Sequence, residues 1–300
     1  ASKLVNCTCD PGYTGPNGGV CLSCAINTFK NTSGDGVCEA CPPNSGNIAS
    51  GTVAEDQCLC LPGYTLSATS GAVPASECVK CEAGYFKEQH GSSACSQCPI
   101  GHYIPAAMQL AGSCLTAWPG FKTNGSQSGQ EKCAAGTFSA SAGSDSCTEC
   151  GTGVYSLIGA TACTACPAGT ANAQTRSADV SACVECVVGT FSASVGSPEC
   201  TPCSGGQFAI TGSSTCIECQ AGLTPNADKS NCEECPGGHH SASVGLAACT
   251  QCDMGEYAFV GATSCTSCPA GTVALHTPAT IDDCIECQAG QFSVSSKPVE

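Results

Sequence analysis

Residues Cys133 to Cys150 read CAAGTFSASAGSDSCTEC, and variants of this stretch fill the chain from Cys9 onward. In each variant, two cysteines enclose about a dozen mostly small and polar residues, and a short spacer then leads to the cysteine that opens the next unit. A unit this short cannot bury a hydrophobic core by itself. The repeat therefore indicates a tandem array of small modules rather than a globular domain.

Cysteine is the most informative residue type in the composition. The chain has 32 cysteines in 300 residues, whereas aromatic residues make up only 5%. This balance is typical of a scaffold in which disulfide bonds replace buried apolar area, and such bonds persist in oxidising compartments. The composition thus predicts a protein that is secreted or lies on the extracellular surface.

The charge balance argues against two classes of partner. The chain has 9 basic and 24 acidic residues, for a net charge of −15, whereas nucleic acid and anionic membrane surfaces are bound by basic patches. No apolar run reaches the roughly 18 residues that a membrane-spanning helix requires. We therefore expect no nucleic-acid partner and no membrane span in this chain.

The spacing of the cysteines indicates how they pair. Thirty of them form two C-x-C and thirteen C-x-x-C pairs, and only Cys114 and Cys133 stand apart. The repeat rule would place cysteines at positions 117 and 130 as well, but these positions hold Ala117 and Gln130. Their joint loss is simplest to explain if the two cysteines were bonded to each other, because a single loss would leave an unpaired thiol.

This interpretation predicts a ladder, in which the second cysteine of each pair bonds the first cysteine of the next pair. A nested scheme with an outer Cys114–Cys133 bond also survives the gap, but it groups the pairs by two and there are 17 pair positions. Spacing alone does not decide connectivity, and we favour the ladder. Its bonds include Cys9–Cys21, Cys24–Cys38, Cys133–Cys147, Cys150–Cys163, Cys166–Cys183 and Cys186–Cys200.

Two further positions recur in the modules. Three residues after each loop-opening position stands glycine, or asparagine at Asn27 and Asn44. Both residue types enter left-handed conformations easily, so we expect a turn with positive φ there in every module. Two residues later, nine modules carry an aromatic ring that we expect to cover a disulfide rather than a substrate. The rings are Phe29, Phe86, Tyr103, Phe138, Tyr155, Phe191, Phe208, Tyr257 and Phe292.

Short alternating segments such as TFSAS and VYSLI, bounded by glycine and serine, predict two-stranded β ribbons with little or no helix. The expected fold class is small disulfide-rich repeats, arranged as an elongated rod because each module contacts mainly its neighbours. The expected organisation is cysteine-rich repeats at 1–113, a module lacking its own disulfide at 114–133, and further repeats at 134–300 with an incomplete last one.

The pattern C-x-x-G-x-[FY]-S…G-x-x-x-C-x-x-C-P-x-G-T resembles the cysteine-rich repeats related to the ephrin-receptor ectodomain. It is also similar to the first half-module of tumour-necrosis-factor-receptor repeats, in which the first cysteine closes onto the next one. Long arrays filled with Ala, Ser, Thr and Gly look most like protist surface proteins, such as ciliate immobilisation antigens and the cysteine-rich proteins of flagellar hairs (mastigonemes). The second half-module of the receptor families is not found, which argues against a cytokine-type receptor.

Motifs for catalysis are lacking. Pairs of C-x-x-C some 13 residues apart also describe zinc sites, but these cysteines form an unbroken series, and no G-x-S-x-G, H-E-x-x-H or phosphate loop occurs. His239 and His240 fill the aromatic slot of their module, where ring packing is expected. We therefore expect a protein that is not an enzyme and has no metal or cofactor.

Three sequons at Asn6, Asn31 and Asn124 predict N-linked glycans, with Asn124 preferred because it lies in a Gly/Ser/Gln-rich loop of the module without a disulfide. The ladder also leaves Cys7 and Cys287 open. A bond between Cys287 of one copy and Cys7 of the next would close a ring only slightly longer than the internal ones, which predicts head-to-tail self-association.

The function expected from these features is that of a structural subunit of an extracellular filament or cell-surface coat. The alternative is a receptor stalk or surface antigen that binds a protein ligand.

Overall fold

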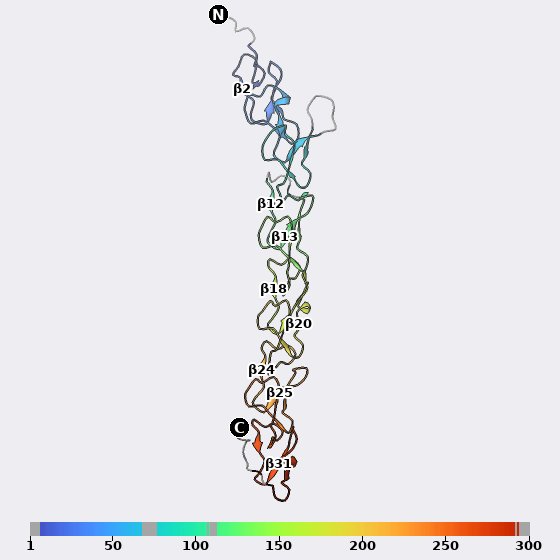
Figure 1. Ribbon diagram of the computed structural model, residues 1–300. Helices are drawn as coiled ribbons and strands as arrows, with labels where there is room; N and C mark the ends of the chain where they lie inside the picture. Colours follow the sequence, from blue (N-terminus) through green and yellow to red (C-terminus); the bar gives the residue numbers. More distant parts are fainter. Residues whose placement is uncertain (1–6, 68–76, 107, 109–112, 292, 294–300) are drawn as a thin grey trace, which may run out of the picture. The chain divides into compact units, whose positions relative to one another are not determined.

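The computed structural model describes residues 7–67, 77–106, 108, 113–291 and 293 (Figure 1). Within these residues the regular elements are antiparallel two-stranded ribbons and three short 3-10 turns, and there is no α-helix. The expected fold of tandem disulfide-rich modules with short ribbons is confirmed. The sequon at Asn6 and the ring of Phe292 lie outside the described residues.

Each ribbon pairs the segment that follows a loop-opening residue with the segment at the close of the same loop. The pairs are β1 (Tyr13–Thr14) with β2 (Leu22–Ser23), β3 (Thr28–Phe29) with β4 (Glu39–Ala40), β5 (Ser45–Gly46) with β6 (Leu59–Cys60), β7 (Tyr64–Leu66) with β8 (Cys78–Lys80), β9 (Tyr85–Phe86) with β10 (Ser96–Gln97), β11 (His102–Tyr103) with β12 (Leu115–Thr116), β13 (Phe121–Thr123) with β14 (Gln130–Lys132), β15 (Thr137–Phe138) with β16 (Thr148–Glu149), β17 (Val154–Tyr155) with β18 (Thr164–Ala165), β19 (Thr170–Ala171) with β20 (Val184–Glu185), β21 (Thr190–Phe191) with β22 (Thr201–Pro202), β23 (Gln207–Phe208) with β24 (Ile217–Glu218), β25 (Leu223–Pro225) with β26 (Cys232–Glu234), β27 (His239–His240) with β28 (Thr250–Gln251), β29 (Glu256–Tyr257) with β30 (Thr266–Ser267), and β31 (Thr272–Ala274) with β32 (Cys284–Glu286). The 3-10 turns are η1 (Glu55–Gln57), η3 (Val180–Ala182) and η4 (Ile281–Asp283).

The chain divides into two compact units. The first comprises Ala1–Ala134, Phe138–Thr148 and Ile158–Ala162, and the second comprises Ala135–Thr137, Glu149–Leu157 and Cys163–Glu300. Both units are built from the same module.

Disulfide bonds close the modules in the ladder order. Each of the fifteen bonds joins a loop-opening cysteine to a cysteine 12 to 18 residues later, with Cα atoms 5.5 to 5.8 Å apart. In the first unit the bonds are Cys9–Cys21, Cys24–Cys38, Cys41–Cys58, Cys60–Cys78, Cys81–Cys95, Cys98–Cys114 and Cys133–Cys147. In the second they are Cys150–Cys163, Cys166–Cys183, Cys186–Cys200, Cys203–Cys216, Cys219–Cys232, Cys235–Cys249, Cys252–Cys265 and Cys268–Cys284. Most opening cysteines are fully buried, so sulfur takes the place of an apolar core.

The turn three residues after each opening position is left-handed in sixteen of the seventeen modules, including those with Asn27 (φ 68°) and Asn44 (φ 62°). The exception is the module opened by Cys203. There Gly206 is not left-handed, and the preceding residue, Gly205, takes a φ of 51° instead. Two consecutive glycines allow the left-handed residue to move by one position, which a single glycine does not.

A second constraint acts on the same glycines. A Cβ built on Gly153 would lie 1.9 Å from the carbonyl oxygen of Gly196, and one on Gly101 would lie 1.9 Å from that of Gly143. In both cases the facing residue belongs to the module after next. The modules therefore contact their second neighbours as well as their first, a closeness that only glycine permits and that we did not predict from the sequence.

Backbone hydrogen bonds at the glycine turn join successive modules. The N–H of Gly153 donates to the carbonyl of Asn172 in the next module at 2.7 Å, and the N–H of Cys166 donates to the carbonyl of Gly153 at 2.9 Å. Equivalent bonds recur in both units, for example Gly120 N–H to the Ser139 carbonyl at 2.8 Å. The polar backbone thus supplies the contacts between modules that apolar side chains supply in globular proteins.

The most consistently buried side chain follows the aromatic slot, six residues after the opening position. Most of its occupants are small, because neighbouring modules enclose it. They are Lys30, Asn47, Lys87, Ile104, Thr123, Ser139, Ser156, Asn172, Ser192, Ala209, Ser241, Ala258 and Ala274. The ring in the slot itself is only half-buried in all described modules except that of Phe29. It lies against the next disulfide where the contact is seen, as Tyr257 packs on the cluster that holds Cys268.

A comparison of Gly153→Ala with Gly255→Ala separates the two constraints on the glycine turn, the left-handed backbone and the close contact with the module after next. Gly255 has the same left-handed turn (φ 83°), but its Cβ would meet nothing within 4 Å. Left-handed strain alone costs about 1–2 kcal/mol, so Gly255→Ala should reduce the hydrogen-exchange protection of the Cys268 N–H by about 5- to 30-fold. Gly153→Ala should reduce that of the Cys166 N–H by at least about 100-fold. Equal losses of protection in the two variants would show that the contact with the second neighbouring module does not contribute to stability.

Candidate functional site

Two free thiols mark the open ends of the ladder. Cys7 is exposed and Cys287 is half-buried. The N–H of Cys287 donates to the Gly271 carbonyl at 2.9 Å, just as that of Cys268 donates to Gly255 at the same distance. Cys287 therefore occupies the geometry of an opening cysteine, with its sulfur in position for a bond that the described residues do not supply.

A cluster with metal-ligand geometry lies at His240. The Nδ1 atom of His240 is 3.1 Å from Sγ of Cys265, and ligand atoms of His240, Cys252 and Cys265 all lie within 4.8 Å of one another. Cys252 and Cys265 are bonded to each other, however. A disulfide does not offer the thiolates that zinc requires. The contact is thus the one expected of the aromatic slot, a ring that covers the next disulfide.

Two lysines occupy the buried position in the first unit. Nζ of Lys87 donates to the carbonyl of Tyr64 at 3.0 Å, in the preceding module, and to that of Gly91 in its own loop. Burial lowers the pKa of the Lys87 ammonium. Lys30 makes the same contacts, with the carbonyls of Tyr13 and Gly34. A Phe-Lys pair that begins two residues after the left-handed turn residue, Asn27 or Gly84, is the sequence signal for this arrangement, and we did not predict it.

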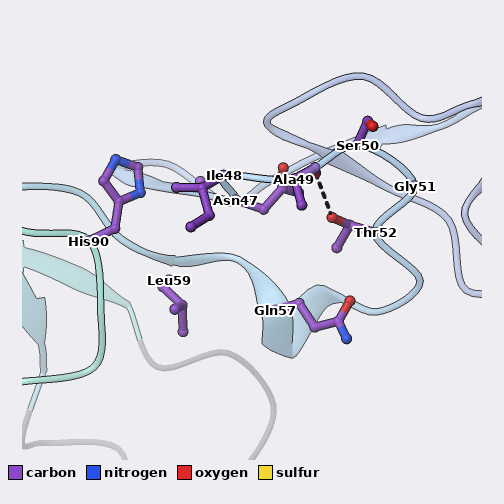
Figure 2. A pocket seen from close by; sticks show the side chains of 10 residues that line it. Asn47, Ile48, Ala49, Ser50, Gly51, Thr52, Gln57, Leu59 and His90 are labelled. Atoms are coloured by element: carbon purple, nitrogen blue, oxygen red, sulfur yellow. Dashed lines mark hydrogen bonds between the residues drawn. The ribbon is translucent and has the colours of Figure 1, made fainter.

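A cleft of about 340 Å³ lies in the first unit beside the long loop of the Cys41–Cys58 module. Its lining is Gly46–Thr52, Gln57, Leu59 and His90. In Figure 2 His90 lies at one end of the view, with Thr52 and Gln57 toward the other, and the hydroxyl of Thr52 donates to the Ala49 carbonyl at 3.1 Å. Ile48, which lines the cleft, is 81% exposed. The cleft is therefore open, with an apolar lip and polar groups from the loop.

A second cleft, of about 830 Å³, lies beside the long loop of the Cys166–Cys183 module in the second unit. Arg176 lines it with a left-handed backbone (φ 56°) and forms an ion pair with Glu149 at 3.4 Å. The carboxylate of Asp179 accepts a hydrogen bond from the Ser181 N–H at 2.7 Å, and hydrogen bonding from Ser181 lowers the pKa of Asp179.

The two clefts are equivalent features of the repeat. Both lie in modules whose buried position holds asparagine, Asn47 or Asn172, and whose loop ends in a 3-10 turn. Each asparagine amide donates to a carbonyl of the preceding module, at 3.0 Å to Thr28 and at 3.1 Å to Val154. The longer loop and the asparagine are the sequence signals for these clefts.

The sequons that the structure describes differ in accessibility. Asn31 is exposed, as are the two residues after it. Asn124 is half-buried, and its side chain closes its own turn: Nδ2 donates to the Ser128 hydroxyl at 3.0 Å, and Oδ1 accepts from the Ser128 N–H at 2.9 Å. An N-linked glycan would have to be attached to the same Nδ2 atom. The geometry therefore favours Asn31 over Asn124.

The model of the "tyrosine-protein kinase ephrin type A/B receptor-like" repeat matches residues 12–58, 69–108 and 136–183. The first and third matches end at Cys58 and Cys183, which close the two modules that carry the clefts. The chain thus contains three ephrin-receptor-like cysteine-rich repeats.

Individual relatives include both receptors and a protist protein. The chain is 43% identical over 58 residues to Ephrin type-B receptor 1 of Gallus gallus, a match that covers 19% of this chain and 6% of the receptor. Ephrin type-B receptor 4 of Homo sapiens is 40% identical over 62 residues, with 20% and 6% covered. Cysteine repeat modular protein A of Toxoplasma gondii is 24% identical over 150 residues, with 40% of this chain and 5% of that protein covered. The matches span only about a twentieth of each relative's length.

Expression in a cell line that adds N-linked glycans tests the ranking of the sequons. We expect Asn31→Gln to remove glycan mass and Asn124→Gln to leave it unchanged, as judged by intact-mass measurement before and after enzymatic deglycosylation. Occupancy at Asn124 with Asn31 bare would contradict the ranking.

Proposed function

We propose that this chain is part of an extracellular repeat array with a structural role, as a disulfide-stapled spacer in a filament or cell-surface coat. The observation that carries the proposal is the ladder, in which one bond closes each of fifteen modules in the described residues. Disulfides at this density are typical of extracellular proteins. The ephrin-receptor-like repeats point to the same compartment.

The ladder supports a passive, durable role. Closing a loop of this size constrains the unfolded chain by about 3 kcal/mol in the entropy model, and each of the fifteen bonded modules keeps its own bond. Resistance to heat and proteases then comes without a large core. In this proposal the chain is not an enzyme, because its modules repeat one packing solution instead of converging polar groups in one deep pocket.

We further propose that Cys7 and Cys287 pair outside the module that each belongs to. Cys287 already holds the geometry of an opening cysteine. The partner sulfur belongs either to a further module of the same polypeptide or to a second copy of this chain. Pairing between copies would be a heterologous contact, which builds filaments when it does not close.

A ligand-binding ectodomain is the second candidate. The two equivalent clefts favour it, because they recur with the ephrin-receptor-like repeats and are open enough to admit part of a protein partner. The named relatives include receptors. Regular fibres in electron micrographs of the purified protein would favour the structural role, whereas dispersed particles would favour the ectodomain.

Non-reducing electrophoresis of the wild-type chain and of a Cys7→Ser/Cys287→Ser variant tests the covalent assembly. We expect a series of multimers for the wild type that collapses to monomer on reduction, and monomer alone for the variant. A wild type that migrates as monomer without reductant would remove self-association through these thiols. Single-serine variants serve as controls, because each lacks one partner of the Cys287–Cys7 bond and should also migrate as monomer.

A further inference from the structure

One module keeps its form without a disulfide. Ala117 and Gln130 stand where its two cysteines would be, and Ala117 is fully buried like an opening cysteine. Side-chain and backbone hydrogen bonds replace the missing bond. Oε1 of Gln130 accepts a hydrogen bond from the N–H of Trp118 at 2.9 Å, which ties the end of the loop to its start.

The ribbon of this module adds further noncovalent support. Strands β13 and β14 pair over three residues, from Phe121 opposite Lys132 to Thr123 opposite Gln130. Nζ of Lys122 lies 3.9 Å from a carboxylate oxygen of Glu131 across the ribbon, with both side chains well exposed. Such an exposed pair is weak. All the contacts that hold this loop closed can therefore break and re-form without any chemical step.

The covalent path along the chain changes character at this module. Elsewhere between Cys9 and Cys284 a load can pass across each loop through its disulfide, whose Cα atoms are 5.5 to 5.8 Å apart. The loop between the bonded cysteines cannot lengthen the chain even when its hydrogen bonds break. Between Cys114 and Cys133 the only covalent path is the polypeptide itself, because these cysteines bond outward to Cys98 and Cys147.

We propose that residues 115–132 form a tension-release element, which opens under load ahead of every other module and lengthens the chain by a fixed step. This inference rests on the proposed structural role of the array. The ribbon is loaded at its open end, where Phe121 and Lys132 face each other, so its hydrogen bonds break one after another rather than together. When the load falls, the same contacts re-form, because no bond has been cut.

The length of the step follows from the register of the ribbon. Opening it frees the eleven peptide steps between Phe121 and Lys132, which span about 36–40 Å at about 3.3–3.6 Å each. The paired residues start about 5 Å apart. The expected gain is thus about 30–35 Å per chain.

Single-molecule stretching of the full chain, held through Cys7 and Cys287, measures this step directly. The wild type should show one reversible step of about 30–35 Å under non-reducing conditions. An Ala117→Cys/Gln130→Cys variant, once its introduced pair is oxidised, should show none. The matched control Ala117→Ser/Gln130→Ser cannot form the bond, and it should keep the step at a lower force because it loses the Gln130–Trp118 hydrogen bond.

A wild type that shows no step, or a step that persists in the oxidised double-cysteine variant, would overturn the proposal. Peptide mapping of the fifteen native bonds confirms that the variant is folded. Limited trypsin digestion in a Lys132→Gln background gives a second readout, because this substitution removes the exposed site outside the introduced ring. A cut at Lys122 should then separate the chain with Ala117 and Gln130 into two fragments without reductant, and should leave the oxidised variant joined. A missing step would disprove the tension-release element but would not change the result of the electrophoresis or the micrographs. Conversely, a monomer on the gel or dispersed particles in the micrographs would count against the proposed structural role but would not change the step.

Discussion

One sulfur–sulfur bond per loop is the constraint on which the rest of this structure depends. A module of this size has only one or two rings and a few small side chains to bury, so hydrophobic burial cannot offset the entropy cost of ordering it. The disulfide limits the freedom of the unfolded loop and places an opening cysteine at its centre. Because the bond lies within the module, each module is stabilised locally, and the array grows by repetition without a growing core.

Contacts between modules use the backbone, and this explains the composition. The glycine turn lets the chain approach the module after next, and the position six residues after each opening cysteine accepts little more than serine, alanine or asparagine in most modules. Lys30 and Lys87 are exceptions that direct their ammonium groups to backbone carbonyls. Repeats rich in Gly, Ala, Ser and Thr are therefore a packing requirement here, and not the mark of a disordered chain.

The sequence predicted the ribbons and the left-handed turn, because cysteine spacing and glycine placement act locally and recur in every module. The contact between Gly153 and Gly196 could not be predicted, since it depends on how successive modules stack. The shift of the left-handed residue from Gly206 to Gly205 could be recognised only from the backbone angles of the structure. Asn124 was preferred as a glycan site from loop composition, which does not show that its amide already closes the turn. The clefts could not be predicted, because a longer interval between cysteines indicates a longer loop but does not show that the loop lines a cleft.

Order of bonding is the central claim, and mass spectrometry of peptides from the unreduced protein tests it most directly. The account predicts that each disulfide joins a loop-opening cysteine to the next cysteine along the chain. It also predicts the bonds Cys98–Cys114 and Cys133–Cys147 on either side of the module that has no disulfide. A Cys114–Cys133 link, or links that skip across several modules, would contradict it.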